Sequence, residues 1–168
     1  MAPEAKLYLA IVERIQKEAP EVRYIEQDLG QLENYQIRPA VSWPCALIDL
    51  DEIDFSDAGN DLVQIGQGFV QIRVGLVKYT DSNNLTPKNI RPNALRYMEQ
   101  AEKLANALHG WAPEGFGRLL LRKSVTEKRD DDIRAKVLRF EISFKVNRTP
   151  AKATVPRPSG IIGSGTPN

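Results

Sequence analysis

The feature that most constrains the fold is an alternating segment near the end of the chain, at residues 134–146. Apolar side chains occupy every second position there, and polar or charged side chains fill the positions between; the apolar set is Leu138, Phe140, Ile142, Phe144 and Val146. Because side chains on a strand point to opposite faces in turn, this pattern predicts a strand with one buried and one solvated face. Residues 118–127 predict a second strand, joined to it by the charged turn at 128–132. The two form a hairpin.

The rest of the chain predicts two amphipathic helices and three further strands. Helices are expected at residues 3–18 and 93–109, and strands at 21–27, 41–50 and 62–80. Asn93 is the expected N-cap of the second helix, and Gly110 is expected to end it. Its buried stripe is predicted to comprise Ala94, Tyr97, Met98, Ala101, Leu104, Ala105 and Leu108. We therefore expect an α+β fold, with a mostly antiparallel sheet of about four or five strands flanked by two helices.

Composition limits the organisation and the chemistry. With 168 residues, the chain fits a single domain, which we expect at residues 1–147, followed by a Pro- and Gly-rich extended tail at 148–168. Cys45 is the only cysteine, so no internal disulfide and no multi-cysteine metal site can form. Neither a signal-peptide pattern nor a membrane-length apolar run is present, so we expect neither secretion by that route nor membrane insertion.

Charge is nearly balanced overall but unevenly placed. The formal net charge is +1, which gives no long-range attraction to nucleic acid or an anionic membrane. Residues 49–61 carry six acids and no base, and we expect residues 51–61 to form a loop between two strands. The tail carries Arg148, Lys152 and Arg157 and no acid. These opposite charges predict a contact between the two regions, within one subunit or between neighbours.

Several residue groups suggest chemistry, but each has a simpler structural explanation. Asp49 and Asp51, with Glu52 and Asp54, resemble the start of a divalent-cation site. A third ligand and a general base are not indicated, so a solvated acidic loop or an interface patch is the favoured interpretation. His109, the only histidine, is expected to cap a helix C-terminus rather than serve a nucleophile.

A basic hairpin surface is the remaining candidate site. Arginine and lysine side chains are frequent between residues 118 and 129, which suggests nucleic-acid binding. The run of three aspartates at 130–132 argues against that function. Mixed charges at a hairpin tip favour a solvated edge or a charge-complementary protein contact.

The order of predicted elements resembles that of the tail terminator, or tail completion, proteins of long-tailed bacteriophages. The resemblance is one of layout and size: the opening helix at residues 7–15, the long strand at 62–80, the helix at 93–109 and the closing hairpin at 118–146. It covers most of the chain up to Val146, without a diagnostic residue motif. The tail after Arg148 is not part of the family pattern.

The resemblance implies a structural role in the virion, at the tail or neck, with assembly in the host cytoplasm. Such proteins form a ring, commonly of six subunits, that stops polymerisation of the tail tube and offers the docking surface for head-side connector proteins. DNA passes through the ring without sequence-specific binding, and neither an enzymatic activity nor a cofactor is implied. The residues expected to form contacts are Asp51, Glu52, Asp54, Asp57, Arg129, Asp131, Arg148, Lys152, Arg157, Ile161 and Ile162.

Three alternatives remain open from the sequence. The first is another neck or head-completion component of a virion. The second is a small metal-dependent hydrolase or nuclease that uses Asp49 and Asp51. The third is an intracellular adaptor without chemistry of its own.

Overall fold

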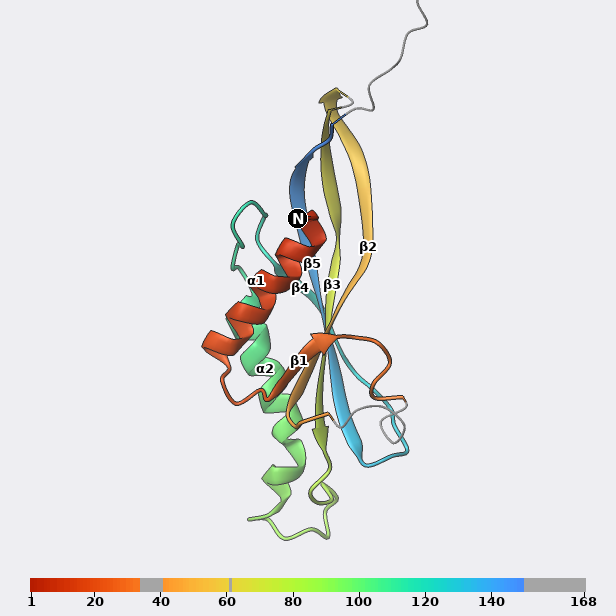
Figure 1. Cartoon of the computed structure of the whole chain (residues 1–168). Helices are drawn as coiled ribbons and strands as arrows, with labels where there is room; N and C mark the ends of the chain where they lie inside the picture. The colour runs from red at the N-terminus through yellow and green to blue at the C-terminus, as the bar shows by residue number, and fades with distance from the viewer. Residues whose placement is uncertain (34–40, 61, 150–168) are drawn as a thin grey trace, which may run out of the picture.

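The computed structural model of the chain describes residues 1–33, 41–60 and 62–149. In these residues two α-helices and a short 3-10 helix accompany one five-stranded sheet of order β1-β2-β3-β5-β4 (Figure 1). The elements are α1 (Pro3–Glu18), β1 (Tyr24–Gln27), β2 (Cys45–Asn60), β3 (Val63–Val77), η1 (Arg91–Leu95), α2 (Arg96–Leu108), β4 (Leu120–Thr126) and β5 (Ile133–Asn147). The predicted α+β class is confirmed.

The centre of the sheet is the antiparallel pair β3 and β5. Their register runs without a break from Val63 opposite Asn147 to Val77 opposite Ile133. Strand β4 pairs with β5, so the predicted closing hairpin joins the same sheet as the long strand before it. Only β1 runs parallel to its neighbour, β2, over four residues. The sheet is therefore mixed, but mostly antiparallel as predicted.

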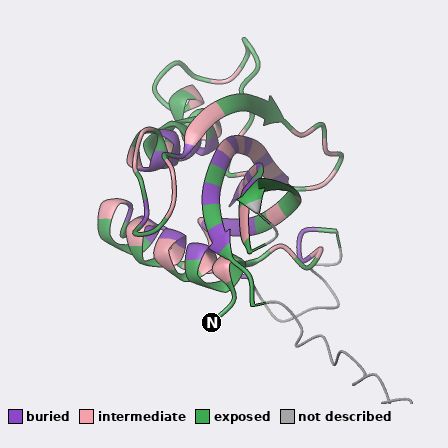
Figure 2. Ribbon diagram, turned by 90° about the horizontal axis from the view of Figure 1, so that it is seen from above, coloured by how far each residue is buried: buried purple, intermediate pink, exposed green. Residues whose placement is uncertain are grey.

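Both helices lie on the same face of the sheet and enclose the main core (Figure 2). The predicted stripe of α1 is confirmed, because Leu7, Ile11 and Ile15 are fully buried. Every apolar position of the alternating segment in β5 is buried too. The stripe predicted for the second helix contains two errors: the side chain of Met98 is 39% exposed, and Ala94 is only half-buried and lies in η1. Met98 lines an open surface hollow together with Lys136 of β5.

The ends of α2 show how backbone chemistry sets a boundary. Asn93 is not the N-cap, since it lies within η1, and the N-cap residue is Leu95, which makes no side-chain cap. Pro92 explains the difference: it fits an early helical position, and the chain turns there as a tighter 3-10 helix before α2 begins. At the other end Gly110, with φ of 78°, follows the helix as predicted.

The face of the sheet without helices is partly buried, against the expectation of one dry and one wet side. A second, smaller cluster forms there, and its buried residues are Leu32, Val41, Cys45, Leu47, Ile133 and Ala135. The chain between β1 and β2 supplies Leu32 and Val41 and covers this end of the sheet. Residues at the start of β2 are therefore buried on both faces, and the alternation there is lost.

The acidic segment is a strand rather than the expected loop. Strand β2 continues through it to Asn60 and pairs with β3, and Gly59, with φ of 86°, lies next to the hairpin turn. Carboxylates on an edge strand remain in water, so their charge does not oppose an extended backbone. The ladder of hydrogen bonds offered by β3 then decides the conformation.

We expect the thiol of Cys45 to be nearly inert in the folded protein. Cys45 is fully buried in the smaller cluster, and burial raises the pKa of its thiol to about 12. The thiolate is the reactive form, so an aromatic disulfide reagent at mildly alkaline pH should react more than about 100-fold more slowly with native than with guanidinium-unfolded protein. Equal rates would show that this cluster opens readily.

Candidate assembly surface

The sheet extends well beyond the helices at one end (Figure 1). We define this extension as the distal blade: residues 51–60 of β2, 63–68 of β3 and 141–147 of β5. Strand β1 pairs with β2 only as far as Ile48. Beyond that point, within the described residues, no strand pairs with the outer edge of β2. Unpaired N–H and C=O groups on such an edge can accept a strand or loop of another molecule.

A bulge shapes this edge. Asp51 and Glu52 interrupt the register between Leu50 and Ile53, and they lie opposite the stretch of β3 that precedes Val70. The backbone of Glu52 comes so close to Gly68 that a Cβ atom there would overlap its carbonyl oxygen. Gly68 therefore permits the bulge, which bends the edge strand and changes the direction of its acidic side chains. The irregularity itself lies on β2, the partner strand of this glycine.

Two acids on the helix-free face of the blade, Asp51 and Glu141, are each held by two other polar side chains. Asp51 accepts a hydrogen bond of 2.8 Å from Nε2 of Gln71 and lies 3.4 Å from the guanidinium of Arg139. Glu141 accepts bonds of 2.6 Å from Arg122 and 3.1 Å from Gln67. The bond from Arg122 is the main reason why the pKa of Glu141 is lowered. These acids are satisfied within the subunit.

Glu52 and Asp54 differ from those acids. Both side chains are exposed, and neither carboxylate makes an ion pair or hydrogen bond with the described part of the chain. They lie beside a hollow of about 220 Å³ that Gln67 and Phe69 also line. Of the acids predicted as contacts, these two are available to a partner.

An aromatic cluster stiffens the blade from its other side. The rings of Phe55 and Phe116 lie 6.2 and 5.1 Å from that of Phe144, and the guanidinium of Arg148 lies 4.9 Å from the ring of Phe55. Arg148 also donates to Oε1 of Gln64, whose Nε2 donates to Asp57. The predicted contact residues Arg148 and Asp57 are thereby brought together at the tip.

The tip of the β4–β5 hairpin is bound to the body of the subunit. Arg129 donates to Asp131 at 2.6 Å, to Glu127 at 3.2 Å and to the carbonyl oxygen of Leu32 at 2.6 Å. Its side chain is 14% exposed. The sequence predicted Arg129 and Asp131 as contacts with other subunits; the structure places them together in an internal network that covers the smaller cluster.

We expect the Arg129–Asp131 pair to give acid-dependent stability. The pKa of Asp131 is lowered, chiefly by the hydrogen bond from Arg129. A depressed folded-state pKa means that the stabilisation is present above the unfolded value near 4 and is lost as pH falls through the folded value. Asp131→Asn should cost about 1–2 kcal/mol at pH 7 in urea unfolding, and the difference should shrink towards pH 3. Asp130→Asn, next to it and exposed, is the matched control; an equal cost there would contradict the assignment.

The remaining predicted site residues are placed as follows. Asp49 lies in register with Gln71, two residues from Asp51, and the pKa of Asp49 is raised by partial desolvation and by the neighbouring carboxylates. The described residues hold no group of three metal-ligating side chains. His109 is at the C-cap of α2, as predicted, and its Nδ1 accepts a hydrogen bond from the backbone of Leu121. Lys152, Arg157, Ile161 and Ile162 lie outside the described residues.

Neither described helix combines the length and the apolar character that crossing a bilayer requires. Comparison with protein-family models and with curated protein sequences finds no match.

Comparison with solved structures finds a similar fold in a virion protein. A chain of the solved structure "Virion of native gene transfer agent (GTA) particle" has the same arrangement, with a TM-score of 0.56 and 14% sequence identity. The likeness covers 86% of this chain and 98% of that one. The two chains therefore share a fold over nearly the whole length of the virion chain.

Proposed function

We propose that the protein is a structural subunit of a phage-like virion, and that it forms the ring that terminates the tail tube. The observation that carries the proposal is the extent of the fold likeness: it spans 98% of a chain found in a virion particle. A shared motif alone would leave much of that chain unmatched. The sequence also supports the proposal, because its predicted fold class and order of elements resemble those of the tail terminator family.

The distal blade supports an assembly role on physical grounds. Within the described ranges its outer strand edge is unpaired and the carboxylates of Glu52 and Asp54 have no partner, which suits contacts with another protein chain. In a closed ring each contact is repeated by symmetry, so modest contacts add up. A hexameric ring that binds the tail tube protein on one side and head-side connector proteins on the other is the finer form of the proposal.

DNA passage is compatible with the charge of the chain. A formal net charge of +1 gives little general attraction to phosphates. A ring that DNA must cross benefits from weak contact with it. The proposed binding partners are therefore proteins, and DNA is proposed to move through the lumen of the ring without specific binding.

The test uses the tail tube protein encoded in the same genome. The tube protein is allowed to polymerise with and without the full chain, and tube lengths and ends are measured by electron microscopy. We expect shorter tubes, each with an added ring at one end. Unchanged lengths with bare ends would contradict the terminator role, and binding to the head-side connector alone would point to another neck component.

A further inference from the structure

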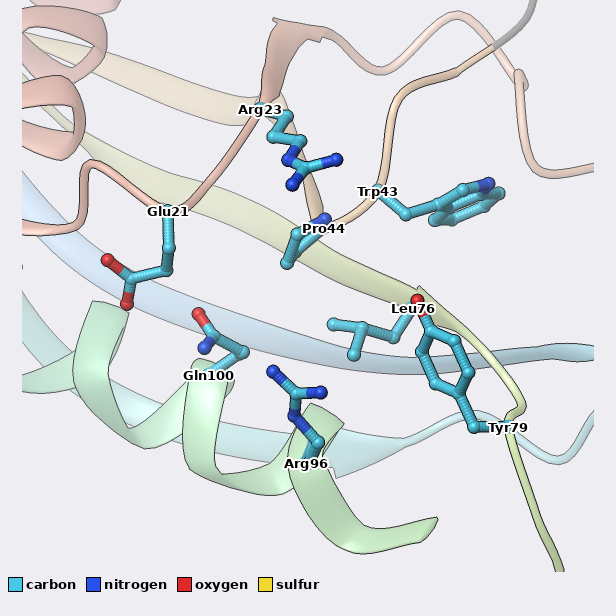
Figure 3. A pocket seen from close by; sticks show the side chains of 8 residues that line it. All are labelled: Glu21, Arg23, Trp43, Pro44, Leu76, Tyr79, Arg96 and Gln100. Carbon is cyan, nitrogen blue, oxygen red and sulfur yellow. The ribbon is translucent and has the colours of Figure 1, made fainter. Parts of the chain in front are cut away.

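A pocket lined by two arginines, Arg23 and Arg96, lies near the start of β2, at the opposite end of that strand from the blade tip. Its volume is about 300 Å³, and Figure 3 shows the side chains around it. Arg23 comes from the segment before β1, and Arg96 is the first residue of α2. Trp43 and Tyr79 form part of its wall. Four separate segments of the chain therefore meet here.

The guanidinium groups of the two arginines have no partner among the described residues. Both side chains are exposed, and neither makes an ion pair or hydrogen bond in that part of the chain. Glu21 is the acid on the pocket wall, and Lys103 already binds it. Two guanidinium groups therefore line one small pocket, and no anion of the described residues compensates them, which favours the binding of a carboxylate or another oxyanion.

Gln100 narrows the class of ligand. Its Oε1 is buried and has no hydrogen-bond partner in the part of the chain that the structure describes. A buried acceptor without a donor is costly. If the Gln100 amide rotates toward the pocket that it lines, a ligand N–H group that donates to this oxygen gains additional free energy. The expected ligand therefore carries carboxylates that bind the arginines and an N–H group that binds Gln100. An acidic stretch of polypeptide with free backbone N–H groups has both.

The distal blade of the same protein is such a stretch. Glu52 and Asp54 are exposed and unpartnered, and they lie on the β2 edge whose backbone groups are free of strand pairing in the described residues. They cannot reach the pocket of their own subunit. Pro44 lines that pocket, and ten residues of extended strand, roughly 33 Å, separate it from Asp54.

We infer that the pocket receives the acidic β2 edge of a neighbouring copy of this chain, with Glu52 and Asp54 of that copy bound by Arg23 and Arg96. The contact joins two different surfaces of the chain, so it is head-to-tail. Repetition of such a contact closes a ring if the rotation between neighbouring subunits divides a full turn evenly. The inference rests on the proposed function, because it describes how the copies of that ring meet.

The first test measures self-association of the full chain by sedimentation velocity over a wide concentration range. Arg23→Glu with Arg96→Glu should weaken association by about 100-fold or more, because two close charge pairs become repulsive. Adding Glu52→Arg with Asp54→Arg to the same chain should restore most of the affinity. The matched control, Lys6→Glu with Lys88→Glu, makes the same change of net charge at exposed sites and should leave association unaltered. Wild-type affinity in the pocket variant, or no rescue in the fourfold variant, would overturn the inference.

The second test does not depend on ring formation or on the tail tube. A synthetic peptide of residues 50–58 is added to the full chain carrying Trp111→Phe, so that Trp43 in the pocket is the remaining tryptophan. We expect a saturable change in fluorescence that is lost in the Arg23→Glu, Arg96→Glu variant and with a peptide whose acids are replaced by amides. Equal binding of the amide peptide, or no binding of the acidic one, would overturn the inference. Uncapped tail tubes alongside specific peptide binding would instead contradict only the terminator role.

Discussion

Replacing Gly68 with alanine should lower the free energy of unfolding by about 3 kcal/mol, measured by urea denaturation at neutral pH. A Cβ at this position would overlap the carbonyl oxygen of Glu52 and lie 2.8 Å from Cα of Ile53. Both are backbone atoms held in the β2–β3 ladder. The bulge must therefore open, and the edge that carries Glu52 must move with it.

Gly66 provides the matched control two residues away on the same strand. A Cβ there would lie 2.9 Å from Cζ of Phe144 and 3.0 Å from Cε1 of Phe55. These are the ends of side chains, which can rotate away, so Gly66→Ala should cost only about 1 kcal/mol. Equal costs for the two variants would contradict the claim that the close backbone approach at the bulge is special.

The second large effect is expected at Arg73: its replacement with methionine should lower the free energy of unfolding by about 2–4 kcal/mol. The guanidinium of Arg73 lies 3.0 Å from Asp28, 2.9 Å from Glu33 and 2.6 Å from Glu127. Its side chain is 21% exposed. Methionine retains much of the packing but leaves three carboxylates without their shared cation, and removal of one partner of a poorly solvated ion pair is expensive.

Arg122→Met is the control for that prediction. Arg122 binds a single acid, Glu141, and its side chain is 53% exposed. Solvent screens such a pair, so the cost should stay below about 1 kcal/mol. If the two variants unfold at the same urea concentration, the network around Arg73 does not stabilise the helix-free side of the sheet.

The parts of the fold that the sequence predicted are those with a regular period. The alternation in β5 and the stripe in α1 each identify a buried face, because burial of one face requires that period. The acidic segment was misassigned because its charges suggested a loop, whereas its pairing with β3 depends on residues far along the chain. The smaller core was missed for the same reason: Leu32 lies in an irregular segment, and no local pattern shows that it covers Cys45.

The candidate contacts were predicted only in part. The sequence identified the acids of residues 51–57, but it could not separate Asp51, which Gln71 satisfies, from Asp54, which has no described partner. Arg23 and Arg96 were missed altogether. They are 73 positions apart and each resembles an ordinary surface arginine; the absence of partners is visible only once the fold brings them together.

We propose that this chain acts through its shape and its free edge, as one subunit of a ring at the end of a virion tail. Cryo-electron microscopy of the assembled particle tests that claim most directly. We expect density for the chain as a closed ring between tail tube and head, with the distal blade of each subunit at the boundary with its neighbour. Particles that lack the chain, or a ring in which the blade points freely into solvent, would contradict the account.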